Sequence, residues 1–130
     1  MQKKVDSKYI YSDLSREIIG ICFSVYNELG AYRYEKIYQK AMAIEFERRN
    51  IKFESEVPAK IFYKGVNIGK RRFDFVVDSK VVVELKVRGY PKKTDYEQVH
   101  EYLKISKLKL GLLIFFSGKN VKIRRIINLY

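Results

Sequence analysis

Hydrophobic positions in the first part of the chain recur at helical spacing. From about Ser12 to Leu29 they lie three or four residues apart, at Leu14, Ile18, Ile21, Val25 and Leu29. This spacing predicts a helix with one apolar face. Ser12 or Asp13 is expected to cap its start, because short polar side chains accept hydrogen bonds from the first free backbone N–H groups, and Gly30 is expected to end it.

A second helix is predicted from about Tyr34 to Arg49. Its apolar stripe consists of Ile37, Ala41 and Ile44. Residues three or four apart share one face of a helix, so we expect this stripe to pack on the core.

From Lys52 onward the pattern changes from helical spacing to strands. Strands are predicted over residues 52–63 and 66–77, with a turn at Lys64-Gly65. After a second turn at 78–80 comes the run Val81–Val87, which is apolar on both faces except at Glu84 and Lys86. Such a run predicts a central strand that is covered on both sides.

The rest of the chain predicts a third helix and two further strands. The helix spans about Thr94 to Lys107, with Thr94 as its cap and Glu97 completing a capping box. Strands follow over 108–116 and 121–127. The order α-α-β-β-β-α-β-β predicts a mixed central sheet flanked by helices, of class α/β or α+β. Without repeats or a Pro/Gly-rich linker, residues 1–130 are expected to form a single domain.

Composition and charge narrow the class of partner. The chain has 27 Lys and Arg residues against 15 Asp and Glu, a net charge of +12. This charge favours nucleic acid as the partner, and the alternative is a solvated basic surface that keeps the protein soluble. No apolar stretch is long enough to cross a bilayer, so no membrane association is expected. The single cysteine, Cys22, excludes an internal disulfide, and a cytoplasmic location is the expectation.

Three charged residues stand out in the apolar hairpin. Glu84 and Lys86 lie two apart on one strand, so their side chains point to the same face. Asp74 lies in the preceding strand. If the hairpin pairs about Ser79, position 74 faces position 84, and the two carboxylates come to about 5 Å apart at Cβ.

Two adjacent carboxylates repel each other unless a cation or a shared proton joins them. A hard cation such as Mg²⁺ or Mn²⁺ prefers oxygen ligands, and no His or Cys lies nearby to suggest zinc. Lys86 beside such an ion could orient a water molecule or stabilise charge on a phosphate. A buried ion pair between Lys86 and a carboxylate is the alternative interpretation of the same residues.

The spacing of these three residues resembles the D-x(n)-[DE]-x-K signature of the PD-(D/E)XK nuclease superfamily. It consists of Asp74, nine intervening residues and Glu84-x-Lys86. Other features between Leu14 and Ile127 resemble the GxxExxY family within it. These are Gly20, Leu29-Gly30, Glu35-x-x-Tyr38, Ala41, Glu45, Arg48-Arg49, Val57-Pro58, Tyr63-Lys64-Gly65, Gly69, Arg72-x-Asp74, Gln98-x-x-x-Tyr102-Leu103, Leu108-x-Leu110-Gly111-Leu112-Leu113 and Arg125-Ile126.

The resemblance implies a restriction-endonuclease-like core and a set of metal ligands. The metal would be held by the carboxylates of Asp74 and Glu84 and by the backbone carbonyl of Leu85. Lys86 would orient or activate the attacking water, and Glu35 would bind the metal directly or through water. One departure concerns the family's naming glycine, three residues before Glu35, which is Tyr32 here.

The same resemblance implies a catalytic role for Gln98, near the metal or the scissile phosphate. Basic residues next to the hairpin strands are expected to bind phosphates of the nucleic-acid backbone. They are Lys70, Arg71, Arg72, Lys92 and Lys93.

Together these features predict an enzyme, a Mg²⁺- or Mn²⁺-dependent nuclease that hydrolyses phosphodiester bonds, with DNA favoured, and leaves a 5′-phosphate. The alternative is a non-catalytic nucleic-acid-binding or assembly module that retains the nuclease fold. Dimerisation is common among such nucleases because two strands need two sites, so a homodimer is also considered.

Overall fold

A five-stranded sheet forms the centre of the computed structural model, and its strands lie in chain order, β1-β2-β3-β4-β5. Residues 10–129 are described; residues 1–9 and 130 of the predicted 1–130 domain lie outside the described residues. The elements are α1 (Ser12–Leu29), α2 (Glu35–Arg48), β1 (Phe53–Tyr63), β2 (Val66–Val77), β3 (Val81–Lys86), α3 (Lys93–Ser106), β4 (Leu110–Phe116) and β5 (Val121–Ile127). The predicted order of helices and strands and the mixed α/β class are confirmed.

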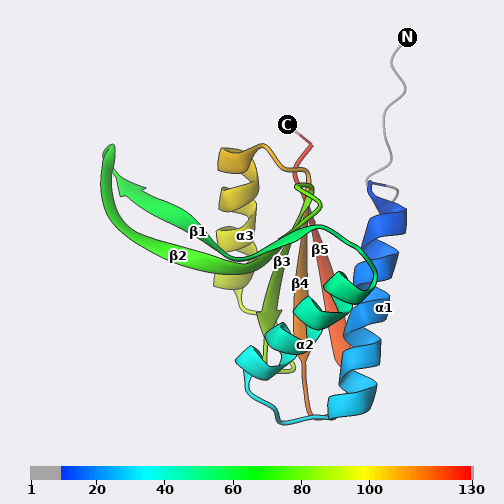
Figure 1. Cartoon of the computed structure of the whole chain (residues 1–130). Helices are drawn as coiled ribbons and strands as arrows, with labels where there is room; N and C mark the ends of the chain where they lie inside the picture. The colour runs from blue at the N-terminus through cyan, green and yellow to red at the C-terminus, as the bar shows by residue number, and fades with distance from the viewer. Residues whose placement is uncertain (1–9, 130) are drawn as a thin grey trace.

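Neighbouring strands are antiparallel except for β3 and β4, which are parallel. A parallel pair cannot be joined by a tight turn, so the chain crosses from the end of β3 to the start of β4 through α3. Figure 1 shows α3 on one side of the sheet and α1 and α2 on the other. The sheet is therefore covered on both faces.

Two apolar clusters fill the space between these layers. Val81, Val83 and Leu85 of β3 belong to the cluster beneath α1 and α2, whereas Val82 belongs to the cluster beneath α3. Every residue of β4 is buried as well. The prediction of a central strand covered on both sides is confirmed for β3, since an alternating strand can be apolar throughout only when both of its faces are buried.

The start of α1 differs from the prediction. Neither Ser12 nor Asp13 caps it. Tyr11 occupies the cap position in a left-handed conformation (φ 51°), and no side chain caps this helix. The first turn is closed by the backbone alone, because Ser15 N–H donates to the carbonyl of Tyr11 at 2.8 Å.

The start of α3 also differs, because the helix begins at Lys93, one residue before the predicted cap Thr94. Asp95 therefore occupies the third helical position, and its carboxylate accepts a hydrogen bond from Lys92 N–H at 2.8 Å. Glu97 instead faces Lys93 at 3.6 Å. The predicted capping box of Thr94 and Glu97 is wrong.

The buried face of α2 is not the predicted stripe. Ile37 and Ile44 are exposed and only Ala41 of the stripe is partly buried against the core. The buried residues lie one or two positions further along and are Tyr38, Gln39, Met42 and Phe46. Tyr38 and Phe46 are larger than the aliphatic residues of the predicted stripe. Burying two aromatic rings removes more apolar surface from water, which decides the rotation of the helix.

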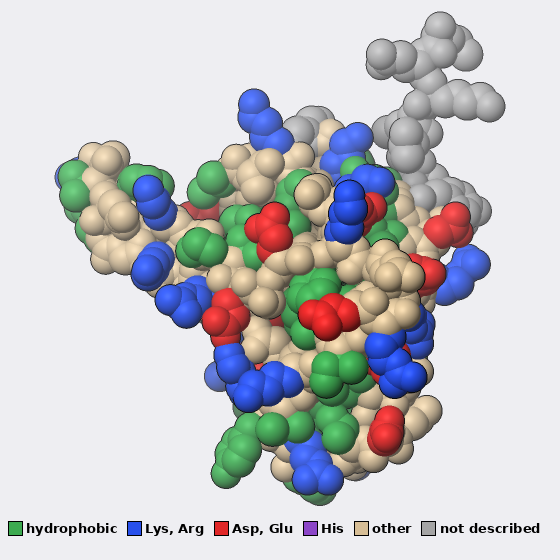
Figure 2. All heavy atoms as spheres, in the orientation of Figure 1, with side chains coloured by type: hydrophobic (Ala, Val, Ile, Leu, Met, Phe, Trp, Pro, Cys, Tyr) green, Lys and Arg blue, Asp and Glu red, His purple; other side chains and the backbone are tan. Residues whose placement is uncertain are grey.

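The outer parts of β1 and β2 form a two-stranded arm, residues 57–72, which extends away from the sheet (Figure 1). Its tip exposes Phe62, Tyr63, Val66 and Ile68. The arm contains five Lys or Arg residues and no Asp or Glu. Figure 2 shows basic and hydrophobic side chains along it.

None of the helices within residues 10–129 is long and apolar enough to span a membrane.

The contact between α3 and β4 yields a stability prediction. A Cβ added at Gly111 would lie 2.5 Å from Cγ1 of Val99, inside the core. Gly111→Ala should therefore lower the free energy of unfolding by about 1–3 kcal/mol through overpacking. Urea or thermal unfolding followed by circular dichroism measures the change.

Gly20→Ala is the matched control, because no heavy atom lies within 4 Å of a Cβ at this helical position. It should raise stability by up to about 1 kcal/mol, the usual difference between alanine and glycine in a helix. Equal stabilities of the two variants would contradict the close packing of α3 on β4.

Candidate metal centre

The candidate site lies where β2 and β3 stop pairing. Their backbone ladder joins Val77 to Val81, Val76 to Val82 and Phe75 to Val83. This is the register predicted from a turn centred on Ser79, and its next step would set Asp74 against Glu84. The backbone pairing ends before that step, so the two carboxylate residues lie at the point where the strands separate.

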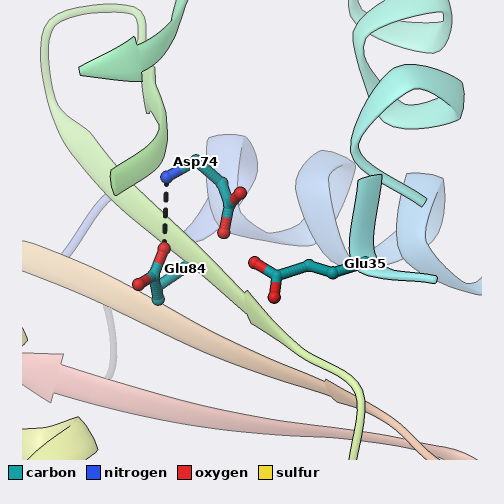
Figure 3. A group of neighbouring side chains, drawn as sticks. All are labelled: Glu35, Asp74 and Glu84. Carbon is teal, nitrogen blue, oxygen red and sulfur yellow. Dashed lines mark hydrogen bonds between the residues drawn. The ribbon is translucent and has the colours of Figure 1, made fainter. Parts of the chain in front are cut away.

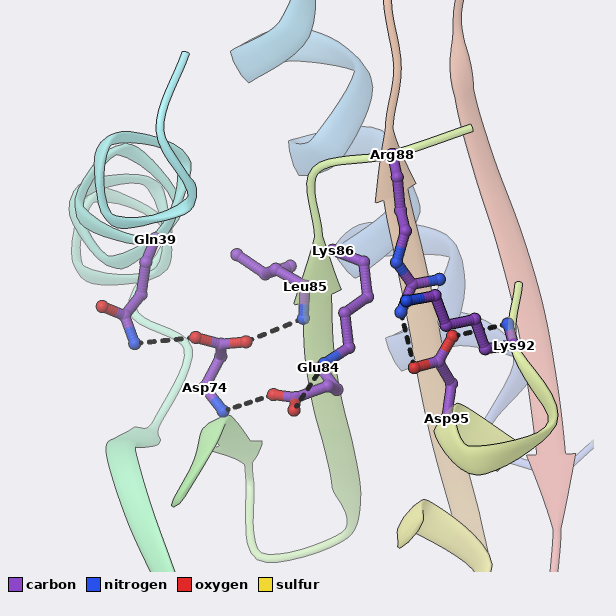
Figure 4. A network of polar contacts seen from close by, with 8 residues as sticks. All are labelled: Gln39, Asp74, Glu84, Leu85, Lys86, Arg88, Lys92 and Asp95. Carbon is purple, nitrogen blue, oxygen red and sulfur yellow. Dashed lines mark hydrogen bonds and ion pairs between the residues drawn. The ribbon is translucent and has the colours of Figure 1, made fainter. Parts of the chain in front are cut away.

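Side chains take over the hydrogen bonds that the backbone no longer makes. Asp74 N–H donates to Oε1 of Glu84 at 3.2 Å, and Leu85 N–H donates to Oδ2 of Asp74 at 2.7 Å. Figure 4 shows these bonds bridging the gap between the strands. Each carboxylate is thus held by a backbone group of the other strand.

A third carboxylate comes from the first residue of α2. Oxygens of Glu35, Asp74 and Glu84 all lie within 4.8 Å of one another. Figure 3 shows Glu35 reaching from the helix toward the pair on the strands. Three residues that the sequence singled out, two by hairpin geometry and one by family resemblance, therefore share one site.

Lys86 forms an ion pair with one carboxylate of this group, that of Glu84. Its Nζ lies 3.7 Å from Oε2 of Glu84, and the side chains of Lys86 and Glu84 are 24% and 12% exposed. The ion pair that the sequence offered as an alternative is therefore present. It leaves Asp74 and Glu35 without a cation of their own among the ion pairs of the described residues.

The placement of Glu35 depends on Tyr38, which is fully buried one turn later in α2. The Tyr38 hydroxyl donates to the carbonyl of Gly30 at 2.7 Å, and its ring stacks on Phe116 at 4.1 Å between centroids. These contacts tie both the helix and the preceding loop to the end of β4. They hold the first turn of α2, and with it Glu35, over the sheet.

Tyr32, three residues before Glu35, has a φ of 65°. This left-handed conformation is the one that glycine adopts most readily. The loop before Glu35 therefore keeps a backbone shape suited to glycine, although its residue is tyrosine.

Gln39 is part of the site and was not anticipated. Its Nε2 donates to Oδ1 of Asp74 at 3.0 Å, and the residue is only 7% exposed. It follows Glu35 by four residues, so both lie on the same face of α2. That spacing was the available signal, since an amide one turn from a candidate metal ligand can orient its neighbours.

Burial and mutual repulsion raise the pKa of two of the carboxyl groups. The pKa of Asp74 is raised to about 8, first by burial and then by the Glu84 carboxyl. The pKa of Glu35 is raised to about 7, first by burial and then by Asp74. The charged forms are disfavoured because too little positive charge stands near them.

The donor set fits a hard divalent cation. It consists of carboxylate oxygens from three residues, with neither His nor Cys among them. Mg²⁺ and Mn²⁺ bind such oxygen ligands, and a bound cation removes the repulsion that raises these pKa values. A hollow of about 280 Å³ beside the carboxylates is lined by Glu35, Lys36, Gln39, Glu56, Arg72 and Asp74.

The basic residues predicted to contact phosphates are distributed unevenly around this hollow. Arg72 lines it and lies 3.7 Å from Glu56. Lys70 is exposed further along the arm, and Lys92 and Lys93 are exposed at the start of α3. Only Arg72 of the predicted set reaches the lining of the carboxylate hollow.

Gln98 is not brought into the carboxylate group. It lines a separate small hollow between α3 and the base of the arm, together with Arg71 and Tyr102. The Tyr102 ring packs on Phe73 there, at 4.7 Å between centroids. The catalytic role of Gln98 stays a prediction.

A second unanticipated contact fixes the chain as it leaves β3. Nη2 of Arg88 donates to Oδ1 of Asp95 at 2.6 Å, and Asp95 is 4% exposed. Burial opposes the Asp95 charge, but the bonds from Arg88 and from Lys92 N–H outweigh it and lower the pKa of Asp95. The contact anchors the loop after Lys86 to the first turn of α3 (Figure 4).

The sequence matches the PD-(D/E)XK nuclease superfamily over residues 12–126, and the chain belongs to this superfamily. Among solved structures, the crystal structure of SSO0001 is similar, with a TM-score of 0.56 and 18% sequence identity. The match covers 93% of this chain and 59% of that chain, so this chain spans little more than half of that protein. At this identity the likeness concerns the fold, and it agrees with the predicted restriction-endonuclease-like core. The comparison with curated proteins found no match.

The raised pKa values predict how stability depends on pH without metal. Between about pH 4 and pH 8 the folded protein retains protons on Asp74 and Glu35 that the unfolded chain releases. The free energy of unfolding should therefore fall as pH rises through this window. Thermal unfolding in EDTA should show a lower melting temperature at pH 8 than at pH 5.

Asp74→Asn should flatten this dependence and raise the melting temperature at pH 8, because the amide carries no charge. Gln39 can keep its bond to residue 74 by turning its amide over. Asp78→Asn, in the exposed turn at the other end of β3, is the matched control and should keep the wild-type slope. An identical pH slope in wild type and Asp74→Asn would contradict the raised pKa of Asp74.

Proposed function

We propose that this protein is a divalent-metal-dependent nuclease of the GxxExxY branch that hydrolyses phosphodiester bonds, with DNA as the favoured substrate. The observation that carries the proposal is the group of three carboxylates of Glu35, Asp74 and Glu84, one of which, Glu84, pairs with Lys86. Membership of a nuclease superfamily and the net charge of +12 support it.

In this proposal Asp74, Glu84 and Glu35 would hold Mg²⁺ or Mn²⁺, with the backbone carbonyl of Leu85 as a further ligand. The cation would supply Lewis acidity toward a phosphate oxygen and toward water. Gln39 holds Asp74 from one side and Leu85 N–H holds it from the other, so the Asp74 carboxylate is oriented before any ion arrives. Such preorganisation is typical of metal ligands.

Lys86 would act on the water and on the phosphate. Its ammonium group is close enough to Glu84 to be fixed, yet remains partly exposed on the side of the site that solvent reaches. It can orient the attacking water and balance the charge that develops on the phosphate oxygens. The water oxygen forms a bond to phosphorus, the bond from phosphorus to the 3′ oxygen breaks, and the departing 3′ oxygen takes a proton. The phosphate remains on the 5′ side.

The nucleic acid would meet a basic surface beside the carboxylates. Arg72 lines the hollow at the base of the arm, and the arm carries further cations without any acidic residue. Lys70, Arg71, Lys92 and Lys93 are proposed as phosphate contacts that position the strand. Gln98 is proposed to act near the scissile phosphate, and residues 1–130 are proposed to form one domain.

Substitution of the site residues should abolish cleavage. Asp74→Asn, Glu84→Gln and Lys86→Ala should each lower kcat on DNA by about 10²-fold or more, because each removes a ligand or a charge needed in the transition state. Labelled single-stranded and double-stranded DNA, incubated with Mg²⁺ or Mn²⁺ and resolved on denaturing gels, measures the rates.

Asp78→Asn and Lys80→Ala are the matched controls. This ion pair of 3.4 Å occupies the exposed turn of the same hairpin, at the end away from the candidate site. Both variants should cleave like wild type. Loss of activity in the controls, or equal cleavage by wild type and the three site variants, would refute the catalytic assignment.

Metal binding should stabilise the folded protein and depend on the same carboxylates. At a free Mg²⁺ or Mn²⁺ concentration about 100 times Kd, the linkage amounts to about 2.7 kcal/mol, which should appear as a higher melting temperature. The effect should grow from pH 6 to pH 8, because ligands must lose their protons to bind. Glu35→Gln and Asp74→Asn should weaken it. Stabilisation of equal size in these variants would place the ion elsewhere.

A further inference from the structure

A third hollow, of about 440 Å³, lies at the end of the sheet where β3 and β4 finish. Tyr32, Tyr90, Lys119 and Lys122 contribute its aromatic and charged side chains, and no acidic residue lines it. The volume falls within the range of small-ligand sites. Its chemistry, phenol rings beside ammonium groups, suits a ligand that is both flat and anionic.

The two tyrosine rings are unusually open to solvent. Tyr32 is 88% exposed and Tyr90 is 60% exposed. Exposed rings of this size gain nothing from the core, and clusters of them commonly mark binding sites. The Arg88 guanidinium lies 5.6 Å from the centre of the Tyr90 ring, but neither ring is buried in the core. The hollow therefore presents two aromatic rings that solvent reaches.

Tyr32 also holds a backbone conformation that tyrosine disfavours. A side chain at a φ of 65° strains the backbone, and glycine would avoid this strain. Burial of the Tyr32 side chain does not offset this strain, because the side chain is exposed. Its hydroxyl end instead rests on Gly118, where an added Cβ would lie 2.4 Å from the hydroxyl oxygen and 2.8 Å from Cζ. The glycine gives the ring room to lie against the turn between β4 and β5.

Two short segments of chain connect the hollow to the candidate metal centre. Tyr32 precedes Glu35 by three residues, so their Cα atoms are at most roughly 11 Å apart. Tyr90 follows Lys86 by four residues, and its carbonyl accepts a hydrogen bond from Nη1 of Arg88 at 2.6 Å. Lys122 braces the same loop, because its Nζ donates to the carbonyl of Gly89 at 3.1 Å. These distances correspond to a few nucleotides of a strand.

We propose that this hollow binds an unpaired nucleotide next to the scissile phosphate, with its base stacked on Tyr32 and Tyr90 and its phosphate beside Lys119 and Lys122. The inference rests on the proposed function and names its substrate class, a single-stranded segment of nucleic acid. In a duplex the faces of the bases are covered by their neighbours, so only an unpaired base can offer its face to a tyrosine.

Binding without metal tests this proposal separately from cleavage. The probes are a fluorescein-labelled oligothymidylate of about 12 nucleotides, a duplex of the same length, and a strand in which the nucleotides lack bases. Fluorescence anisotropy in EDTA gives Kd for each. Wild type should bind the oligothymidylate more tightly than either of the other probes.

Tyr32→Ala and Tyr90→Ala should each raise Kd for the oligothymidylate by about tenfold and leave Kd for the base-free strand nearly unchanged. Gly118→Ala should act in the same direction, because its methyl group would collide with the Tyr32 ring, 2.4 Å from the hydroxyl oxygen, and displace it. Phe23→Ala, at an exposed aromatic residue of α1 that lines neither the carboxylate hollow nor this one, is the control and should bind like wild type.

Lys119→Gln and Lys122→Gln should each reduce the salt dependence of binding by roughly one phosphate contact. Lys52→Gln is the control for these charges, because Lys52 adjoins the 78–80 turn at the other end of β3. Equal binding by wild type and the tyrosine variants would overturn the proposal. So would a duplex bound as tightly as the single strand, or an equal loss in the tyrosine variants on the base-free strand.

The proposed function fails in a different way. A wild type that cleaves no nucleic acid with Mg²⁺ or Mn²⁺, yet shows the predicted tyrosine dependence of binding, would refute nuclease activity and support the stacking site. A wild type that cleaves, with tyrosine variants that bind and cleave alike, would support nuclease activity and overturn the stacking site.

Discussion

The separation of β2 from β3 beyond Phe75 is the constraint on which the rest of the site depends. Paired strands satisfy their backbone groups with each other, but here Asp74 N–H and Leu85 N–H are satisfied by carboxylates. Buried backbone donors must find partners, so the carboxylates of Asp74 and Glu84 stabilise the fold whether or not they bind a metal. The same separation brings oxygens from both strands to one place and leaves room for α2 to add another. A continuous ladder would have closed this space with backbone.

Three segments distant in the sequence converge on that gap, and each is held by contacts outside it. Tyr38 ties the first turn of α2 to Gly30 and Phe116, so Glu35 is carried on a braced helix end. Arg88 and Asp95 tie the exit of β3 to α3, which fixes the loop beyond Lys86. The carboxylates are therefore held close together by packing and hydrogen bonds elsewhere, and this is what allows their mutual repulsion to persist in the fold. Preorganisation of this kind is costly in stability and useful for binding a cation.

The sequence predicted those features that depend on local pattern. The register of the hairpin followed from the short turn at Ser79, and the position of β3 followed from its apolar run. The face of α2 did not follow, because stripes one residue apart both fit a helical period and the choice depends on what the aromatic rings meet in the core. Gln39 and the contact between Arg88 and Asp95 were missed for a related reason: their partners are distant in sequence and meet only after the helices have packed. Glu35 was found through family resemblance, which carries tertiary information that periodicity lacks.

The arm has a consequence for how such a protein can evolve. In the arm, the two strands pair only with each other, from Pro58 with Arg72 at the base to Tyr63 with Val66 at the tip. Adding or removing equal numbers of residues on both strands would leave the register at the base untouched, and with it the position of Asp74. The length of the arm can thus vary under selection while the carboxylates stay where they are. The arm can therefore change in length during evolution, whereas the segment of β2 that bears Asp74 is fixed by its packing in the fold. The two lie next to each other on one strand.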